Sequence, residues 1–174
     1  MSPAWVIWAP ALVASTSVPA LAAVYLTVEE AQQLIFPDRN FTLVPVTLSE
    51  DQRKTVQEKS GIPVRARQER VWRTDEGGHL IIDDVIGKHE FITFAVGINP
   101  DGSVRQVEIL NYREAYGFEV RQKKWRRQFI GKTGASELSL NDDIKNISGA
   151  TLSCRHVTEG VKRALALYDL IIKK

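Results

Sequence analysis

Sulfur is scarce in this sequence. Of its 174 residues, only Cys154 is a cysteine and only Met1 is a methionine. A single thiol cannot close an internal disulfide, so the fold has to be held by its core rather than by crosslinks. The length suits one domain, because a chain of this size buries about two-thirds of the surface that its unfolded form exposes.

The sequence also lacks the motifs of several protein classes. It has no Cys-x-x-Cys-His for haem attachment, no Gly-x-Ser-x-Gly of a hydrolase and no Gly-x-Gly-x-x-Gly of a dinucleotide fold. His79, His89 and His156 are not spaced with cysteine or acidic residues as metal ligands are, so we expect no metal site. The formal net charge of +2, without any nucleic-acid motif, argues against a nucleic-acid binder.

Charge is absent from residues 1–22, whereas all 23 basic and 21 acidic residues follow this segment. The segment holds a short apolar run, Trp5–Ala14, and ends in Ala20-Leu21-Ala22, which fits an A-x-A cleavage site. We therefore predict a signal peptide over residues 1–22 and a single exported domain over 23–174. The protein would be periplasmic or otherwise extracytoplasmic, and membrane-anchored if the N-terminal segment is retained.

The first half of the domain predicts two short helices around an edge strand. Thr27 with Glu30 has the spacing of a capping box before an apolar pair, and Ser49 opens a polar helix that runs to about Lys59. Between them, Phe41–Leu48 contains a proline, which restricts it to the edge of a sheet.

The second half carries the clearest strand signal. Phe91–Ile98 is rich in β-branched and aromatic residues, Asn99-Pro100-Asp101-Gly102 is a turn, and Val104–Leu110 alternates as the returning strand. Further strands are expected within Val64–Thr74 and around residues 80–86, and apolar residues recur at helical spacing from Ser153 to about Lys174. The fold class is therefore α+β: an antiparallel sheet with a central hairpin, packed against a long C-terminal helix and shorter N-terminal helices.

A basic segment, residues 121–132, precedes the C-terminal helix. Trp125 and Phe129 stand four residues apart, which predicts an amphipathic helix with both rings on one face. Its basic side is either a solvated face or a docking surface for a partner.

The most informative stretch is Ser148-Gly149-Ala150-Thr151, at the start of the C-terminal helix. Small residues suited to a turn place a threonine hydroxyl where unpaired backbone N–H groups and the helix dipole favour a phosphate. Geometry alone predicts an anion site. These four residues, followed by Leu152 and Ser153, resemble the flavinylation motif of the FMN-binding domain family, which includes the G and C subunits of the Rnf and sodium-pumping quinone reductase complexes.

The resemblance implies an FMN cofactor joined to Thr151 by a phosphoester, with residues 148–153 framing it. Glu114 and Gly117 match a Glu-Thr-Pro-Gly loop of the family, while Ala115 and Tyr116 replace its Thr and Pro. Tyr116 is expected either to stack on the flavin ring or to be a half-buried aromatic residue.

Two basic positions complete the comparison with the family. Lys132, in a Gln-Phe-x-Gly-Lys segment, matches a stretch that precedes the motif and is a candidate contact to the phosphate or flavin. Lys145 stands where many members have Asp, a departure that bears on recognition by the modifying enzyme.

The resemblance implies an exported electron carrier that a flavin transferase matures and that exchanges electrons with a membrane reductase or a cytochrome. The chemistry would belong to the cofactor, so we predict no catalytic side chain. Two alternatives stay open: a flavin-dependent reductase of a small molecule, and a binding module without flavin.

Overall fold

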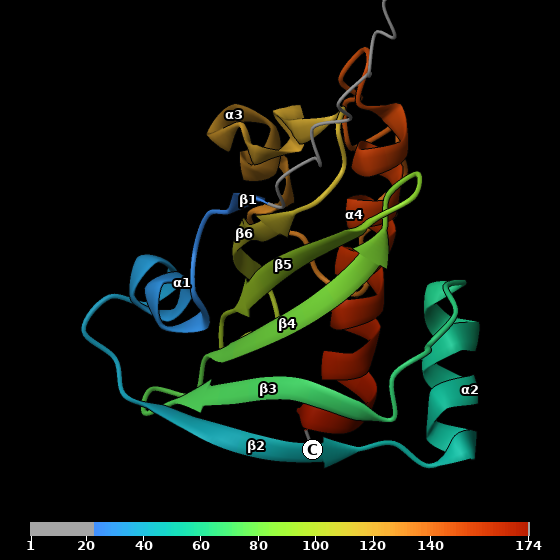
Figure 1. Cartoon of the computed structure of the whole chain (residues 1–174). Helices are drawn as coiled ribbons and strands as arrows, with labels where there is room; N and C mark the ends of the chain where they lie inside the picture. Colours follow the sequence, from blue (N-terminus) through green and yellow to red (C-terminus); the bar gives the residue numbers. More distant parts are fainter. Residues whose placement is uncertain (1–22, 174) are drawn as a thin grey trace, which may run out of the picture.

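The computed structural model describes residues 23–173, and the predicted signal peptide lies outside this range. Within it, six antiparallel strands form one sheet in the order β1-β6-β5-β4-β3-β2 (Figure 1). The strands are β1 (Ala23–Val24), β2 (Phe41–Thr47), β3 (Gln68–Thr74), β4 (His79–Ile86), β5 (Phe91–Ile98) and β6 (Val104–Tyr112). The predicted hairpin is confirmed as β5–β6, and the proline-containing strand β2 lies at an edge, as expected.

Side chains alternate along each strand, so apolar side chains lie on both faces of the sheet, and each face packs against a helix. On β5, Phe94 and Val96 belong to the larger core, which also contains the apolar face of α4 (Thr151–Leu167). Ala95 belongs to a smaller core on the opposite face, beneath α1 (Val28–Ile35). The predicted α+β fold is therefore correct.

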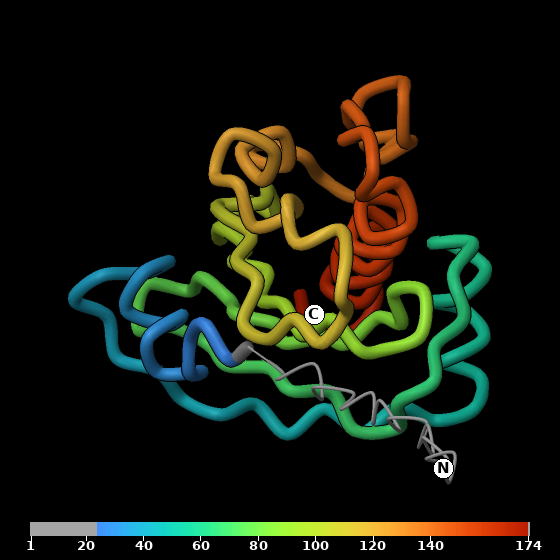
Figure 2. Tube along the Cα trace, turned by 45° about the horizontal axis from the view of Figure 1, so that its top comes forward, coloured from blue at the N-terminus to red at the C-terminus, as the bar shows by residue number. Residues whose placement is uncertain are grey.

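The helices begin and end where the sequence indicates. Thr27 and Ser49 each close a capping box, at the starts of α1 and α2 (Glu50–Ser60), and Gly61 ends α2 in the left-handed conformation. Helix α2 packs beside α4 (Figure 2), and the last turn of the C-terminal helix, Tyr168–Ile172, widens to a π-helix.

The prediction of one amphipathic helix over residues 121–132 is wrong. The chain forms three short pieces instead: a 3₁₀ turn at Phe118–Arg121, α3 (Lys123–Arg126) and a second 3₁₀ turn at Arg127–Phe129. Trp125 and Phe129 are nevertheless both buried, with their rings edge to face at 5.2 Å. The pairing of the two aromatic residues was thus correct although the regular helix was not.

Candidate functional site

The first turn of α4 presents a hydroxyl and unpaired backbone donors on the surface. Ala150 is the N-cap residue, no side chain caps the helix, and the first helical N–H group to bond within it is that of Cys154, which donates to the Ala150 carbonyl. Thr151 is exposed, and its Oγ1 accepts a hydrogen bond from Nδ2 of Asn146 at 2.9 Å. The helix dipole adds positive potential at this end, so the turn can hold a phosphate.

The loop that carries Asn146 is fixed by the segment over residues 121–132. Trp125 donates its indole N–H to the carbonyl of Lys145 at 2.7 Å, and the Lys145 N–H donates to Oε1 of Gln128 at 2.8 Å. Trp125 and Gln128 of this segment therefore anchor the residues that precede the threonine.

Gly117 packs directly on the same turn of α4. Its φ is +89°, and a Cβ there would lie 2.7 Å from Oγ of Ser153 and 2.8 Å from the hydroxyl of Tyr112. Tyr112 and Ser153 are themselves hydrogen-bonded at 2.8 Å, and the tyrosine hydroxyl also donates to the Tyr116 carbonyl. Two stretches far apart in sequence, the glutamate-containing loop and the Ser-Gly-Ala-Thr turn, thus meet as one site.

Glu114 holds a neighbouring turn. Its Oε1 accepts from the backbone N–H groups of His89 and Glu90, and a Cβ on Gly87 would lie 2.6 Å from that oxygen. Burial would raise the pKa of Glu114, but the N–H donors of Glu90 and His89 outweigh it and the pKa falls below its usual value. Glu114 therefore ties the β4–β5 turn to the loop, and a contact with the flavin itself stays a prediction.

Three large apolar side chains are exposed around this junction. Tyr116 is 84% exposed, Phe118 52% and Leu152 41%. The alternative of a half-buried Tyr116 is therefore wrong. An apolar surface beside a phosphate site suits the flat ring system of a flavin.

Ser148 and Gly149, at the front of the turn, are exposed. Gly149 has φ +85° and nothing within 4 Å of the position where a Cβ would stand, so space is open before the helix.

Lys132 has a partner of its own. Its Nζ lies 2.8 Å from Oδ2 of Asp143, and its carbonyl accepts from the N–H of Val104, at the start of β6. Burial would raise the pKa of Asp143, but Lys132 and the N–H groups of Ser139 and Leu138 lower it on balance. The structure does not bring Lys132 to Thr151, and its proposed contact with FMN stays a prediction.

Sequence reasoning missed three residues of this site: Asn146, Tyr112 and Phe118. Tyr112 and Phe118 flank the glutamate-containing loop, one on each side. The available signal for Tyr112 was that it is the aromatic residue at the end of an alternating strand. Nothing in the sequence pattern marked Asn146.

The residues present fit a phosphorylated flavin. The open helix start suits its phosphate, Thr151 offers an exposed hydroxyl, and the exposed apolar side chains offer a platform for a ring. Within residues 23–173, no cluster of His, Cys, Asp and Glu is arranged to hold a metal ion. No helix in the same range is both long and apolar enough to cross a membrane.

Fold and site together define a small α+β domain that offers a phosphate-binding helix start and a hydroxyl beside an apolar platform. Residues 87–166 match the model of the FMN-binding domain, and this match supports FMN as the cofactor. Over 86 residues the chain is 28% identical to the G subunit of the Na(+)-translocating ferredoxin:NAD(+) oxidoreductase complex of Acetobacterium woodii. The alignment covers 44% of this chain and 42% of that relative, so the chain spans less than half of the relative's length.

Proposed function

We propose that this chain is an exported electron carrier whose FMN is joined to Thr151 by a phosphoester. The observation that carries the proposal is the exposed Thr151 hydroxyl in the uncapped first turn of α4. Its oxygen accepts a hydrogen bond from Asn146, and it stands in the turn where helix N–H groups favour a phosphate.

The bound flavin would supply the redox chemistry, and the protein would bind and orient it. The N–H groups of the first turn would bind the phosphate, and Asn146 would orient the ester oxygen. Tyr116, Phe118 and Leu152 would contact the ring and exclude water from one of its faces. Covalent attachment suits an exported carrier, since a dissociated flavin would be lost by dilution.

The partners follow from the same proposal. The relative is named as part of a redox complex, which supports a membrane reductase or a cytochrome as the electron partner here. A flavin transferase would mature the protein after the segment over residues 1–22 has directed export. Exposed basic side chains at Lys123, Lys124 and Arg127 would steer an acidic partner surface towards it.

The test is to express the chain with a flavin transferase in an exporting host, denature it, and measure its intact mass and absorbance. We expect one FMN phosphoester, mapped to the peptide that contains Thr151. Thr151→Ala should give a folded, colourless protein. Thr55→Ala is the matched control, because Thr55 is also an exposed helical threonine, on α2, and should leave flavin content unchanged.

Flavin that stays on the denatured Thr151→Ala chain would show that the attachment site is wrong. A wild-type chain that binds FMN yet releases all of it on denaturation would show that the cofactor is not covalent. Intact precursor in the cytoplasm, with residues 1–22 uncleaved, would contradict export by a cleaved signal.

A further inference from the structure

The sheet is split between two neighbouring strands, β3 and β4. The β3–β4 ladder ends at the Arg70–Ile82 pair, although β3 begins at Gln68 and β4 continues to Ile86. Each strand keeps its other neighbour: Gln68 pairs with Thr47 of β2, and Ile86 pairs with Phe91 of β5. The two strands therefore diverge in the middle of the sheet (Figure 1).

A cavity of about 780 Å³ lies at this divergence, within the usual size range of small-molecule sites. The connection from α2 to β3 lines one side, with Ile62 among its residues, and α4 lines another. Ile86 and Phe91, which are 37% and 48% exposed, form an apolar part of the wall.

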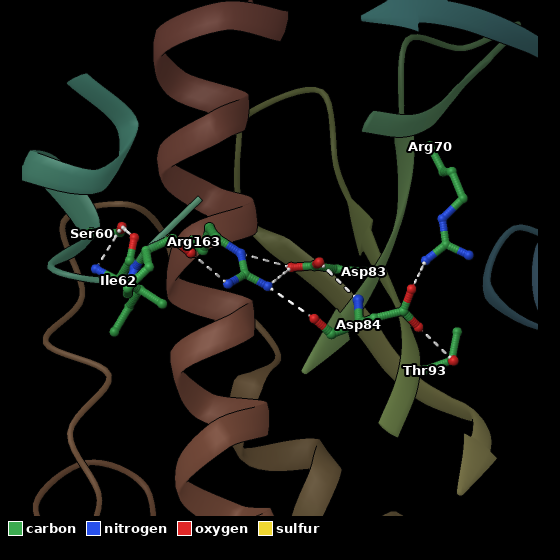
Figure 3. A network of polar contacts seen from close by, with 8 residues as sticks. Ser60, Ile62, Arg70, Asp83, Asp84, Thr93 and Arg163 are labelled. Atoms are coloured by element: carbon green, nitrogen blue, oxygen red, sulfur yellow. Dashed lines mark hydrogen bonds and ion pairs between the residues drawn. The ribbon is translucent and has the colours of Figure 1, made fainter. Parts of the chain in front are cut away.

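The ion pairs at the cavity are already complete (Figure 3). Arg163 donates to Oδ2 of Asp83 at 2.5 and 3.0 Å and to the Pro63 and Asp84 carbonyls. Asp84 accepts from Arg70 at 2.6 Å and from the Thr93 hydroxyl at 2.6 Å. These groups hold the walls and have little capacity left for a ligand.

Three other charged side chains in the wall, Glu69, Glu159 and Arg65, make no hydrogen bond or salt bridge to any residue in the described range. Burial, and then the nearby Asp83, raise the pKa of Glu69 to about 7, against the opposing effect of Arg163 and Arg70. Four acidic side chains (Glu69, Asp83, Asp84 and Glu159) and three arginines (Arg65, Arg70 and Arg163) line the cavity, so its formal charge is negative. The carboxylates of Glu69 and Glu159 are free to accept hydrogen bonds from a cation.

We propose that this cavity is a second ligand site that binds a small organic cation: Glu69 accepts hydrogen bonds from its charged group, and Ile86 and Phe91 contact its apolar body. An ammonium group supplies the donors that Glu69 accepts, and the ring of Phe91 adds a cation–π contact at the wall. The cavity lining includes neither Thr151 nor Glu114, although Gly87 of the lining lies against Glu114, so the proposal does not depend on covalent attachment of the flavin.

Binding should depend on pH, because only the ionised Glu69 attracts a cation. The charged or titratable groups that share the cavity with Glu69 are Asp83 and Asp84 of β4, Arg163, Glu159 and His156 of α4, Arg70 of β3, and Arg65. Because the pKa of Glu69 is raised to about 7, the ionised form predominates only above neutral pH, so binding should be stronger at higher pH.

The test is a chemical-shift titration of the FMN-loaded full chain with 2-phenylethylamine, whose ammonium stays protonated throughout. We expect shifts confined to the cavity residues and an affinity that rises by about tenfold between roughly pH 6 and pH 8, following the ionised fraction of Glu69. Uncharged 2-phenylethanol and anionic 3-phenylpropionate should each bind at least about tenfold more weakly.

Glu69→Gln should weaken binding of the amine and flatten its pH dependence, and Phe91→Ala should weaken binding at every pH. Glu58→Gln, an exposed change on α2 outside the cavity, is the matched control and should match the wild type. Equal binding of the amine and the alcohol would overturn the proposal, as would an unaltered Glu69→Gln variant. Binding of the amine to the flavin-free Thr151→Ala variant but not to the FMN-loaded wild type would also overturn it, because the flavin would then fill the cavity.

Discussion

At the scale of single residues, the site depends on a backbone position that only glycine fills without strain. Gly117→Ala should destabilise the domain by about 2–4 kcal/mol, because an alanine at φ +89° costs about 1–2 kcal/mol and its Cβ also meets Ser153 and Tyr112. Denaturant unfolding followed by circular dichroism measures this loss.

Gly131→Ala is the matched control for that change. Gly131 has φ +80° but nothing within 4 Å of the position that an added methyl group would take, so only the backbone cost of about 1–2 kcal/mol should appear. Equal losses in the two variants would show that the contact between the loop and α4 contributes nothing.

Asn146 is the residue whose amide directs the threonine hydroxyl. Asn146→Ala should slow FMN incorporation by about tenfold, the effect of losing one hydrogen bond of about 1–1.5 kcal/mol that orients the reacting oxygen, while the fold persists. A time course of intact mass with the flavin transferase measures the rate. Asn40→Ala removes a similar exposed side-chain bond, to Asp75, and should leave the rate unchanged; a shared slowing would refute a specific role of Asn146.

At the scale of elements, the sequence predicted those structures whose causes are local. The capping boxes at Thr27 and Ser49 and the turn at Asn99–Gly102 are set by neighbouring residues, so α1, α2 and the β5–β6 hairpin were predictable. The Ser-Gly-Ala-Thr turn was predictable for the same reason, as the start of a helix.

The segment after β6 was not predictable in this way. The buried Arg126–Glu108 ion pair and the bond from Trp125 to the Lys145 carbonyl involve residues distant in the chain, and they accompany short helical pieces rather than one regular helix. Asn146 escaped notice for the same reason, because its role depends on how Trp125 and Gln128 fix its loop. The meeting of Gly117 with Ser153 is likewise a tertiary contact.

Arg163 joins three elements: α4, β4 and the connection from α2 to β3. Arg163→Met should destabilise the domain by about 3–5 kcal/mol, because it leaves the buried Asp83 carboxylate without its partner and frees the Pro63 carbonyl. Thermal or denaturant unfolding measures the loss. Lys54→Met, which breaks the exposed pair with Glu58 at 3.9 Å, should change stability by less than about 0.5 kcal/mol; losses of similar size would contradict the role given to Arg163.

At the scale of the whole molecule, the two proposed sites occupy places where the regular sheet ends or opens. The proposed flavin site lies beyond the end of β6, and the cavity lies where β3 and β4 part. Covering both faces of the sheet stabilises the remainder through two cores, so these openings can be tolerated. The divergence of β3 and β4 should lower the free energy of unfolding in a pH-dependent way.

This decrease comes from Glu69, whose pKa of about 7 in the fold exceeds the ordinary value of 4.5. Between these two values the folded state holds more protons than the unfolded state, so the free energy of unfolding falls as pH rises and then levels off above about pH 8. Glu69→Gln removes the titrating carboxyl and, with it, this fall in the free energy of unfolding. The variant should therefore gain about 1–2 kcal/mol relative to the wild type on going from about pH 4 to pH 8, after allowance for partial solvent screening.

Urea unfolding of both proteins across this pH range measures the difference directly, and taking the difference cancels the contributions of other titrating groups. Glu58→Gln should run parallel to the wild type, because its carboxylate is exposed. If Glu69→Gln also runs parallel, the carboxyl is not desolvated in solution and water already fills the split between β3 and β4. A widening gap would instead mean that the sheet holds this acid at a free-energy cost, which a bound cation would relieve.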